Sequence, residues 1–310
     1  MNFPFFSQSW WLEAIAPGAW GEVLVEKGGT LYARLPYVSR RKWGLRILDM
    51  PPLTQTLGPW LRPHAGKYAS RLGEEKELMT ELIERLPPFD IFQQRFHPSI
   101  TNWLPFYWKG FEQTTRYSYV IEKLTDLDSI WEGLEKSVRT SIRKAEKEVI
   151  VRDDLGLDKF VGLEEMVFKR QGRALPYSVE LLERLDQACL AHNCRRMFFA
   201  EDAHGSLHAA AYIIWDDQSA YYLMGGGDPE LRGSGASSLC LWRAIKFAGS
   251  VTSSFDFEGS MLEDVEHFFR AFGAKQRPYF DVRKINSTLV GAAFDLWLRT
   301  RHIYQRGGSR

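Results

Sequence analysis

The sequence predicts an α+β protein of two domains, each built on a mixed β-sheet flanked by helices. The chain has 310 residues, enough for about two domains of roughly 100–200 residues each. Hydrophobic residues make up 45% of the chain and charged residues 25%, as in globular proteins and unlike disordered or fibrous chains. In the second half, two helical patterns precede three strand patterns, and helices and strands then alternate. This order favours a mixed sheet with helices packed on it.

The first half contains the patterns of a sheet with two helices. Gly28 and Gly29 separate two apolar runs and predict the turn of a hairpin. The second predicted helix stops before Pro87, because the residue before a proline disfavours helical backbone. The expected helices are 9–16 and 74–86, and the expected strands are 21–27, 30–38, 44–49, 90–96 and 117–121.

The clearest helical pattern runs from residue 126 to residue 148. Its apolar side chains recur every three or four residues and form one stripe, made of Leu134, Val138, Ile142, Ala145 and Val149. A basic row lies beside the stripe and consists of Arg139, Arg143 and Lys147. Such a row is either a solvated helix face or a cationic wall for a phosphate-bearing or anionic substrate. The sequence leaves both interpretations open.

The second half supplies the remaining elements. We expect helices at 157–170, 179–193, 234–248 and 261–272, and strands at 196–201, 207–215, 220–225, 254–258 and 276–282. A last helix from residue 286 to about residue 304 is expected to pack back on the first domain. The predicted domains are 1–125 and 126–285, followed by this C-terminal segment at 286–310.

Composition and spacing exclude several classes of protein. Lys and Arg total 40 against 39 Asp and Glu, and this balance argues against non-specific coating of nucleic acid. The cysteines Cys189, Cys194 and Cys240 form no C-x-x-C pair, so we expect reduced residues in a cytoplasmic protein. The apolar start lacks a basic segment and contains Pro4, so we expect no signal peptide. No Cys and His spacing fits zinc, so no metal is expected.

A glycine-rich turn at 225–236 joins a predicted strand to a predicted helix. Its small residues, Gly233, Ser234, Gly235 and Ala236, leave backbone N–H groups uncovered where the helix begins. Such amides, together with the helix dipole, bind anions, and Arg232 can add a guanidinium charge. The alternative interpretation is a plain loop whose serines cap the helix.

Two carboxylates follow one another on the predicted strand 254–258. Asp256 and Glu258 would share one face, while Phe255 and Phe257 would share the other. Two acids at the end of a strand can orient or deprotonate an amine. The alternative is that they form salt bridges with Arg270 or Arg277.

A third candidate region is the polar link between two predicted helices, at residues 170–177. Arg173 and Tyr177 lie in it and could line a groove for an acceptor, although a simple inter-helix loop fits equally well. Tyr222 and Tyr279 lie on predicted strands, where most tyrosines belong to the core.

These pieces together resemble a known family. Arg232, Gly233, Ser234, Gly235 and Ala236 are similar to the pyrophosphate-binding motif [QR]-x-x-G-x-[GA] of GNAT acyltransferases, with Ser237 where Gly or Ala is usual. The segments RTSIRKAEK at 139–147, RQG at 170–172, PYS at 176–178, FDFEGS at 255–260 and FFRAFGA at 268–274 resemble the FemAB-like branch. That branch includes peptidoglycan-bridge aminoacyltransferases and the BioF2-like or CelD-like acetyltransferases. The resemblance covers residues from about 115 to 283.

The resemblance implies tandem GNAT-like domains and an N-acyltransferase. The expected reaction moves an acyl group from acyl-CoA, such as acetyl-CoA, to a primary amine of a sugar, amino acid or cell-envelope precursor. Residues Arg232 to Ala236 would hold the coenzyme A pyrophosphate. Glu258, with Asp256 beside it, would be the general base or would orient the acceptor amine, and Tyr222 would protonate the leaving thiolate. The residues expected to contact substrate are Arg173, Tyr177, Arg139, Arg143, Arg270 and Tyr279.

Two alternative functions stay open. A Fem-type aminoacyltransferase would use aminoacyl-tRNA to extend a peptidoglycan peptide, and the basic row at 139–147 is the feature that suggests it. A non-catalytic binding module would keep the same fold and groove, because fold alone does not fix function.

Overall fold

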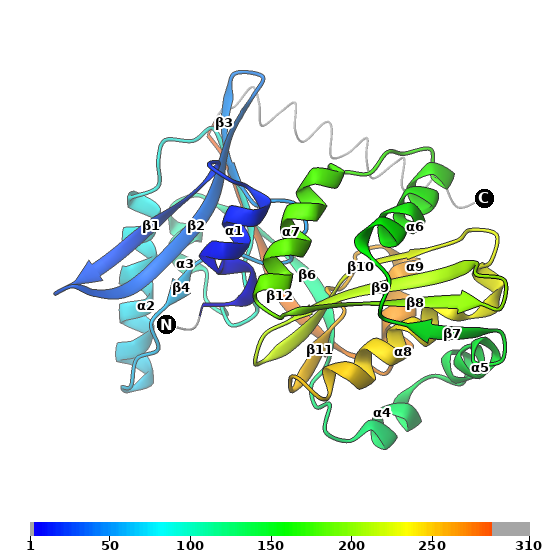
Figure 1. Ribbon diagram of the computed structural model, residues 1–310. Helices are drawn as coiled ribbons and strands as arrows, with labels where there is room; N and C mark the ends of the chain where they lie inside the picture. The colour runs from blue at the N-terminus through cyan, green and yellow to red at the C-terminus, as the bar shows by residue number, and fades with distance from the viewer. Residues whose placement is uncertain (1–2, 287–310) are drawn as a thin grey trace. The chain divides into compact units, whose positions relative to one another are not determined.

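The computed structural model describes residues 3–286, in which the chain forms two compact units. Unit 1 contains residues 3–7, 16–115 and 279–286, and unit 2 contains residues 8–15 and 116–278. Each unit has its own strands, helices and apolar core (Figure 1). The expected helix at 286–304 lies outside the described residues, apart from its first position.

Unit 1 is a sheet with two helices of its own. Its strands are β1 (Trp20–Lys27), β2 (Thr30–Lys42), β3 (Leu45–Asp49), the short β4 (Trp60–Leu61) and β5 (Ile91–Arg95). They follow the order β1-β2-β3-β5, with β12 (Lys275–Ile285) beside β5 and β4 beside β2. The helices are α2 (Tyr68–Glu84) and α3 (Leu104–Trp108), and a 3-10 turn, η1 (Phe5–Ser7), precedes them. The hairpin at Gly28 and Gly29 forms as predicted.

Unit 2 carries most of the predicted motifs on a six-stranded sheet. The strands are β6 (Glu112–Ile121), β7 (Val149–Arg152), β8 (Arg195–Asp202), β9 (Leu207–Trp215), β10 (Ser219–Gly227) and β11 (Ser254–Asp256). Their order is β6-β11-β10-β9-β8-β7, and only the β10–β11 pair is parallel. The predicted mixed sheet is therefore confirmed.

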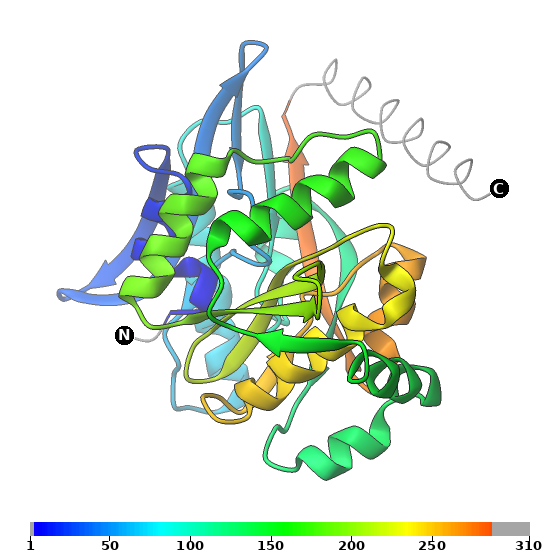
Figure 2. The same cartoon turned by 45° about the vertical axis from the view of Figure 1, so that its right-hand side comes forward.

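Helices cover both faces of this sheet (Figures 1 and 2). One face carries α6 (Leu157–Arg170) and α7 (Val179–Ala191), and α1 (Ser9–Ile15) packs on α7. The other face carries α4 (Leu127–Gly133), α5 (Lys136–Ala145), α8 (Ala236–Ala248) and α9 (Glu263–Arg270). Inward-facing β9 residues Ala209, Ala211 and Ile213 pack in the same core as these helices. Alternate β9 residues face α6, as the contact between Tyr212 and Phe160 shows.

The helix predicted over 126–148 is two helices, and its last residues, 146–148, form a turn that leads into β7. The chain leaves helical geometry at Leu134 and Glu135, both of which have extended backbone angles. The Glu135 N–H donates to the Ala271 carbonyl at 2.8 Å instead of to its own helix. The predicted apolar stripe is nevertheless confirmed, because Leu134, Val138, Ile142, Ala145 and Val149 are all buried. The apolar residues keep a spacing of three or four across the break, because both helices pack on the same core. The spacing alone therefore did not reveal the break.

Candidate active site

Strand β10 separates from its parallel neighbour after the first third of its length. It pairs with β11 only where Ser219 to Tyr221 lie beside Ser254 to Asp256. Beyond these residues β10 continues to Gly227, whereas β11 has ended. The edge of β10 from Tyr222 onward therefore has no strand partner on that side within the described chain. A sheet edge of this kind presents backbone donors and acceptors to other groups.

A β-bulge lies at the point of separation. Tyr222 pairs with Ile213 of β9 and Met224 pairs with Tyr212, so Leu223 is the extra residue. A bulge leaves its extra residue outside the ladder and redirects the neighbouring side chains, which is why bulges are frequent beside active sites. The sequence analysis did not predict this bulge, since nothing in the run at 219–227 marks an inserted residue.

The turn from Arg232 to Ala236, here called the entrance turn, leads directly into α8. Residues Arg232–Ser234 form a 3-10 turn, η2, and Gly235 adopts left-handed backbone geometry with φ of +80°. A Cβ atom at Gly235 would lie 2.4 Å from the Ser141 carbonyl oxygen on α5. Both the backbone angle and the close packing therefore require glycine at this position.

Most of the first amides of α8 are bonded locally. The Ala236 N–H donates to Ser234 Oγ at 3.3 Å, and the Ser238 and Leu239 N–H groups donate to the Gly235 carbonyl. Ser237 is exposed, and its amide is the one in this first turn that makes no hydrogen bond within the described residues. The helix start is thus open to an anion at Ser237, where the motif's small residue is replaced by serine.

Two cations lie at the entrance turn. Arg232 is exposed and donates from Nε to the Pro229 carbonyl at 3.0 Å, which leaves the terminal nitrogens of its guanidinium toward solvent. Lys144 of α5 donates from Nζ to the Gly233 carbonyl at 2.6 Å. Sequence analysis missed Lys144 because it falls between the members of the basic row at 139, 143 and 147.

The basic row itself does not act as one surface. Arg139 donates to the carbonyls of Trp131, Glu132 and Leu134, so its guanidinium closes the C-terminal end of α4. Arg143 is exposed and lies 5.5 Å from the centre of the Trp131 ring. Arg139 thus has a structural role, and Arg143 and Lys144 carry exposed positive charge on α5.

The two predicted carboxylates lie at a sharp turn. The strand ends at Asp256, two residues earlier than predicted, and Glu258 has a φ of +58°. Buried Asp256 accepts hydrogen bonds from the Ser118 hydroxyl and, at 2.7 Å, from the Glu258 amide. Asp256 therefore holds the turn, while Glu258 is half-buried beside the end of the strand. The predicted salt bridges to Arg270 are absent among the described residues, since Arg270 pairs with Glu266 and Glu135.

The two carboxylates contribute to the raised pKa of a neighbouring tyrosine, Tyr221. Tyr221 lies beside Asp256 in the parallel register. Burial, and then the negative charges of Asp216, Asp256 and Glu258, raise the pKa of Tyr221 well above its usual value. This phenol therefore stays protonated at any physiological pH.

A buried carboxylate that the sequence analysis missed lies on α6. Glu164 is 4% exposed and accepts a hydrogen bond from the Tyr177 hydroxyl at 2.7 Å. The same hydroxyl lies 3.4 Å from Met224 Sδ on the bulged part of β10. Burial raises the pKa of Glu164, although the Tyr177 hydrogen bond opposes this effect. The available clue was its position four residues after Phe160, on the buried face of a predicted helix.

Tyr222 lies on the opposite face of β10 from Met224. It packs against the ring of Phe269, and a Cβ atom at Gly225 would lie 1.6 Å from its hydroxyl oxygen. Gly225 thus makes room for this hydroxyl. Burial, and then the charges of Glu164 and Cys240, raise the pKa of Tyr222, so its phenol is a proton donor rather than a base.

Arg173 and Tyr279 complete the set of predicted residues. Arg173 is exposed on the link between α6 and α7. Tyr279 is buried on β12 within unit 1, whereas all the other candidates belong to unit 2.

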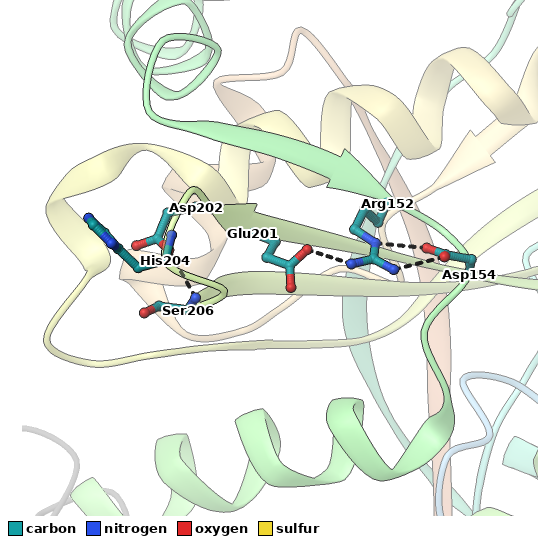
Figure 3. Close-up of polar contacts among 6 residues, drawn as sticks. All are labelled: Arg152, Asp154, Glu201, Asp202, His204 and Ser206. Atoms are coloured by element: carbon teal, nitrogen blue, oxygen red, sulfur yellow. Dashed lines mark hydrogen bonds and ion pairs between the residues drawn. The ribbon is translucent and has the colours of Figure 1, made fainter.

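Asp202 holds the β8–β9 turn through backbone amides (Figure 3). Asp202 accepts the amides of His204 and Ser206, and these hydrogen bonds, led by that of Ser206, hold the pKa of Asp202 at about 2. Arg152 of β7 donates to Asp154 and Glu201 beside this turn. In residues 3–286, no group of three or more His, Cys, Asp or Glu side chains could hold a metal ion. Over the same residues, none of the helices has the length and apolar character that a bilayer crossing requires.

Comparison with known proteins shows what the chain is similar to. Residues 134–270 match the family described as acetyltransferase (GNAT) domain. The part of unit 2 that contains the entrance turn is therefore similar to a GNAT acetyltransferase domain, and this match supports a transferase. No curated protein sequence matches the chain.

Solved structures with the same fold extend over nearly the whole chain. FemX aligns with a TM-score of 0.62 at 12% identity and covers 90% of this chain and 92% of its own. The C-terminal domain of a putative lysylphosphatidylglycerol synthetase from Agrobacterium fabrum aligns with a TM-score of 0.53 at 12% identity, over 91% and 88% of the two chains. The L-PGS structure from Bacillus licheniformis gives 0.51 at 11% identity, over 93% and 90%. These folds are consistent with the FemAB-like branch.

Proposed function

We propose that this protein transfers an acyl group from acyl-CoA to a primary amine. The observation that carries the proposal is the entrance turn, where Gly235, the open Ser237 amide and the charges of Arg232 and Lys144 meet at the start of α8. Backbone amides, a helix dipole and cations together recognise a diphosphate. The acceptors that we infer are a sugar amine, an amino acid or a cell-envelope precursor.

The remaining groups fit the steps of an acyl transfer. Acyl-CoA supplies a thioester, whose carbonyl carbon is attacked by the amine nitrogen while the carbon–sulfur bond breaks. The unpaired backbone at Leu223 offers a donor for the developing oxyanion. The neutral phenol of Tyr222 gives a proton to the departing thiolate, and Glu258 orients the amine. Arg173 and Arg143, both exposed, are left to contact distal parts of the substrates.

Acetyl-CoA is the probe that tests the donor. Ligand binding to the folded state raises its stability by about 2.7 kcal/mol when the ligand is at 100 times Kd. We expect acetyl-CoA to raise the melting temperature of the wild type. Arg232→Ala should weaken binding by about tenfold, since a hydrogen bond to a charged group contributes about 1.5–3 kcal/mol. Arg243→Ala, an exposed arginine further along α8, is the control and should bind normally. An unchanged melting curve for the wild type in saturating acetyl-CoA would refute the proposed donor.

The aminoacyl-tRNA alternative has one observation in its favour. Arg143 and Lys144 are exposed on α5, which packs against the entrance turn, and Lys147 is exposed in the turn that follows α5. The fold that the chain shares with FemX is compatible with this alternative, as it is with acyl-CoA. Filter binding of charged tRNA across a salt series decides between the two donors, because contacts to phosphates weaken steeply with salt.

The variant Glu258→Gln distinguishes an enzyme from a non-catalytic binding module. We expect this substitution to preserve acetyl-CoA binding and to reduce the release of thiol from acetyl-CoA in the presence of an amine. A wild type that binds acetyl-CoA but releases no thiol with any primary amine would favour the binding module.

A further inference from the structure

Glu164 is a buried carboxylate whose hydrogen-bonding capacity is only partly used. Its Oε2 atom accepts from Tyr177, and no other hydrogen bond to this carboxylate is made by the described residues. A carboxylate has two oxygens and about four acceptor positions. Buried charged groups are usually paired, because an unpaired charge is costly to bury. Glu164 therefore has the chemistry of a site for a cation that arrives with a ligand.

The position of Glu164 relates this chemistry to the proposed reaction. A Cβ atom at Gly226 would lie 3.1 Å from the Glu164 backbone nitrogen, so α6 packs directly on the part of β10 that follows the bulge. The Tyr177 hydroxyl touches both Glu164 and Met224. The carboxylate is thus held against the unpaired stretch of β10, where the thioester carbonyl is proposed to lie.

We propose that Glu164 binds the ammonium group of the acceptor and removes its proton, with Tyr177 as the residue that positions it. This inference rests on the proposed function and assigns the general base of that same site. In the step, the acceptor R–NH3⁺ gives one proton to the Glu164 carboxylate, and the free electron pair of the nitrogen attacks the thioester carbon. The carbon–sulfur bond then breaks, and its electron pair remains on sulfur. Tyr222 gives its proton to this thiolate, and the second proton lost by the nitrogen restores the Tyr222 phenol.

The surroundings of Glu164 raise its pKa and so increase its affinity for a proton. The titratable group in contact with Glu164 is Tyr177 on the α6–α7 link, and Tyr222, on the opposite face of β10, is close enough to be affected by the charge of Glu164. Both phenols have raised pKa values, so neither carries charge at neutral pH. Burial raises the pKa of Glu164 itself toward the range in which a carboxylate accepts a proton from an amine most effectively.

Glu164→Gln and Glu165→Gln form a matched pair of variants. Both remove one carboxylate from α6, but Glu165 is exposed. Glutamine keeps an oxygen for the Tyr177 hydroxyl, so the Glu164 variant should fold. With acetyl-CoA and ethanolamine, glucosamine or lysine as probe amines, we expect Glu164→Gln to lower kcat/KM by about 100-fold or more, the usual range for a general base. Glu165→Gln should stay within about twofold of the wild type. Equal rates for Glu164→Gln and the wild type would overturn the assignment.

Tyr177→Phe supplies a readout that a purely structural role would not move. The Tyr177 hydrogen bond lowers the pKa of Glu164, so its loss should raise that pKa. A base must be deprotonated to act, and the acidic limb of the kcat/KM profile should therefore shift to higher pH in Tyr177→Phe. The same limb should vanish in Glu164→Gln. A limb that stays in place in both variants would contradict the proposal.

Amine binding without any donor separates this inference from the proposed function. We expect calorimetry to detect binding of at least one probe amine to the wild type, with tighter binding as Glu164 ionises and at least tenfold weaker binding to Glu164→Gln. Acetyl-CoA binding should be the same in both proteins and should be weakened by Arg232→Ala. Loss of amine binding with intact acetyl-CoA binding in Glu164→Gln supports Glu164 as the base. A wild type that binds the amine but no acetyl-CoA refutes only the proposal that acyl-CoA is the donor. Failure of all three amines to bind would overturn the role of Glu164.

Discussion

Two buried polar groups of unit 1, Arg34 and Gln94, use more of their hydrogen-bonding capacity than Glu164 of unit 2. In unit 1, Arg34 is 2% exposed and donates both to Glu22 and to the Ser7 carbonyl. Gln94 is fully buried, accepts from the Gly58 amide at 3.2 Å and donates to the Pro36 carbonyl at 2.8 Å. In unit 2, Glu164 is buried to a similar degree but has a single hydrogen-bond partner.

The difference separates groups that hold the fold from groups that can engage a ligand. Arg34 and Gln94 connect segments more than ten residues apart, and a ligand could bind them only by breaking native hydrogen bonds. Glu164 can accept a further donor without such a loss. Burial alone therefore does not identify a site. Unused hydrogen-bonding capacity at a buried charge does, because the native structure leaves part of its desolvation cost uncompensated.

The largest predicted effect lies in unit 1. Arg34→Ala should reduce the free energy of unfolding by about 3 kcal/mol, since removing one partner of a buried ion pair typically costs about 3–5 kcal/mol, and Glu22 is partly solvated. Urea titration measures the change. Arg40→Ala is the control, because Arg40 is an exposed arginine of the same strand, β2, that pairs with Asp49 on β3, and it should lose less than about 1 kcal/mol. Equal losses for the two variants would show that burial does not distinguish these arginines.

The second prediction concerns the backbone of the entrance turn. Gly235→Ala should destabilise the protein by about 2 kcal/mol, because a side chain in left-handed geometry costs about 1–3 kcal/mol and would also press on the Ser141 carbonyl. The variant should also lose its stabilisation by acetyl-CoA. Gly233→Ala is the matched control, since a Cβ atom there meets nothing within 4 Å. Thermal melts with and without acetyl-CoA measure both effects, and a Gly235 variant that keeps the acetyl-CoA shift would separate the turn from donor binding.

Sequence patterns predicted helices and strands of unit 2 well where the hydrophobic periodicity changes at the ends of the element. Strand β9 was predicted at 207–215 and α6 at 157–170, and both have these bounds in the structure. Strand β7 was missed, because Val149 continues the apolar stripe of α5 and so reads as helix. The short helix α3 was missed because its aromatic run, with Pro105 inside it, carries no helical periodicity.

The candidate site was predictable only where local sequence determines geometry. The requirement for glycine at the entrance turn is local, and the motif therefore identified Gly235. Lys144 and Glu164 acquire their positions through packing of α5 and α6 on other elements. The bulge at Leu223 depends on the register between β9 and β10. Contacts between residues that are distant in the chain produce no recognisable spacing in the sequence.

The smallest predicted effect is a change in how stability depends on pH. A glutamate has a pKa near 4.5 when unfolded, and burial raises the pKa of Glu164 above this value in the folded protein. The folded state therefore binds more protons than the unfolded state between the two pKa values, so this group lowers stability as pH rises from about 4.5 toward the folded pKa. Glutamine cannot ionise and should remove this loss.

Urea titrations of the wild type and Glu164→Gln across this pH range test the prediction. The free energy of unfolding of the variant should gain on that of the wild type as pH rises, and the difference should level off once Glu164 is ionised in the folded protein. Each unit of pKa difference contributes about 1.4 kcal/mol. The neighbouring phenols Tyr177 and Tyr222 stay neutral throughout and add no slope. A difference that does not vary with pH would mean that the carboxylate titrates as if it were in solvent, and Glu164 would then resemble the saturated groups of unit 1.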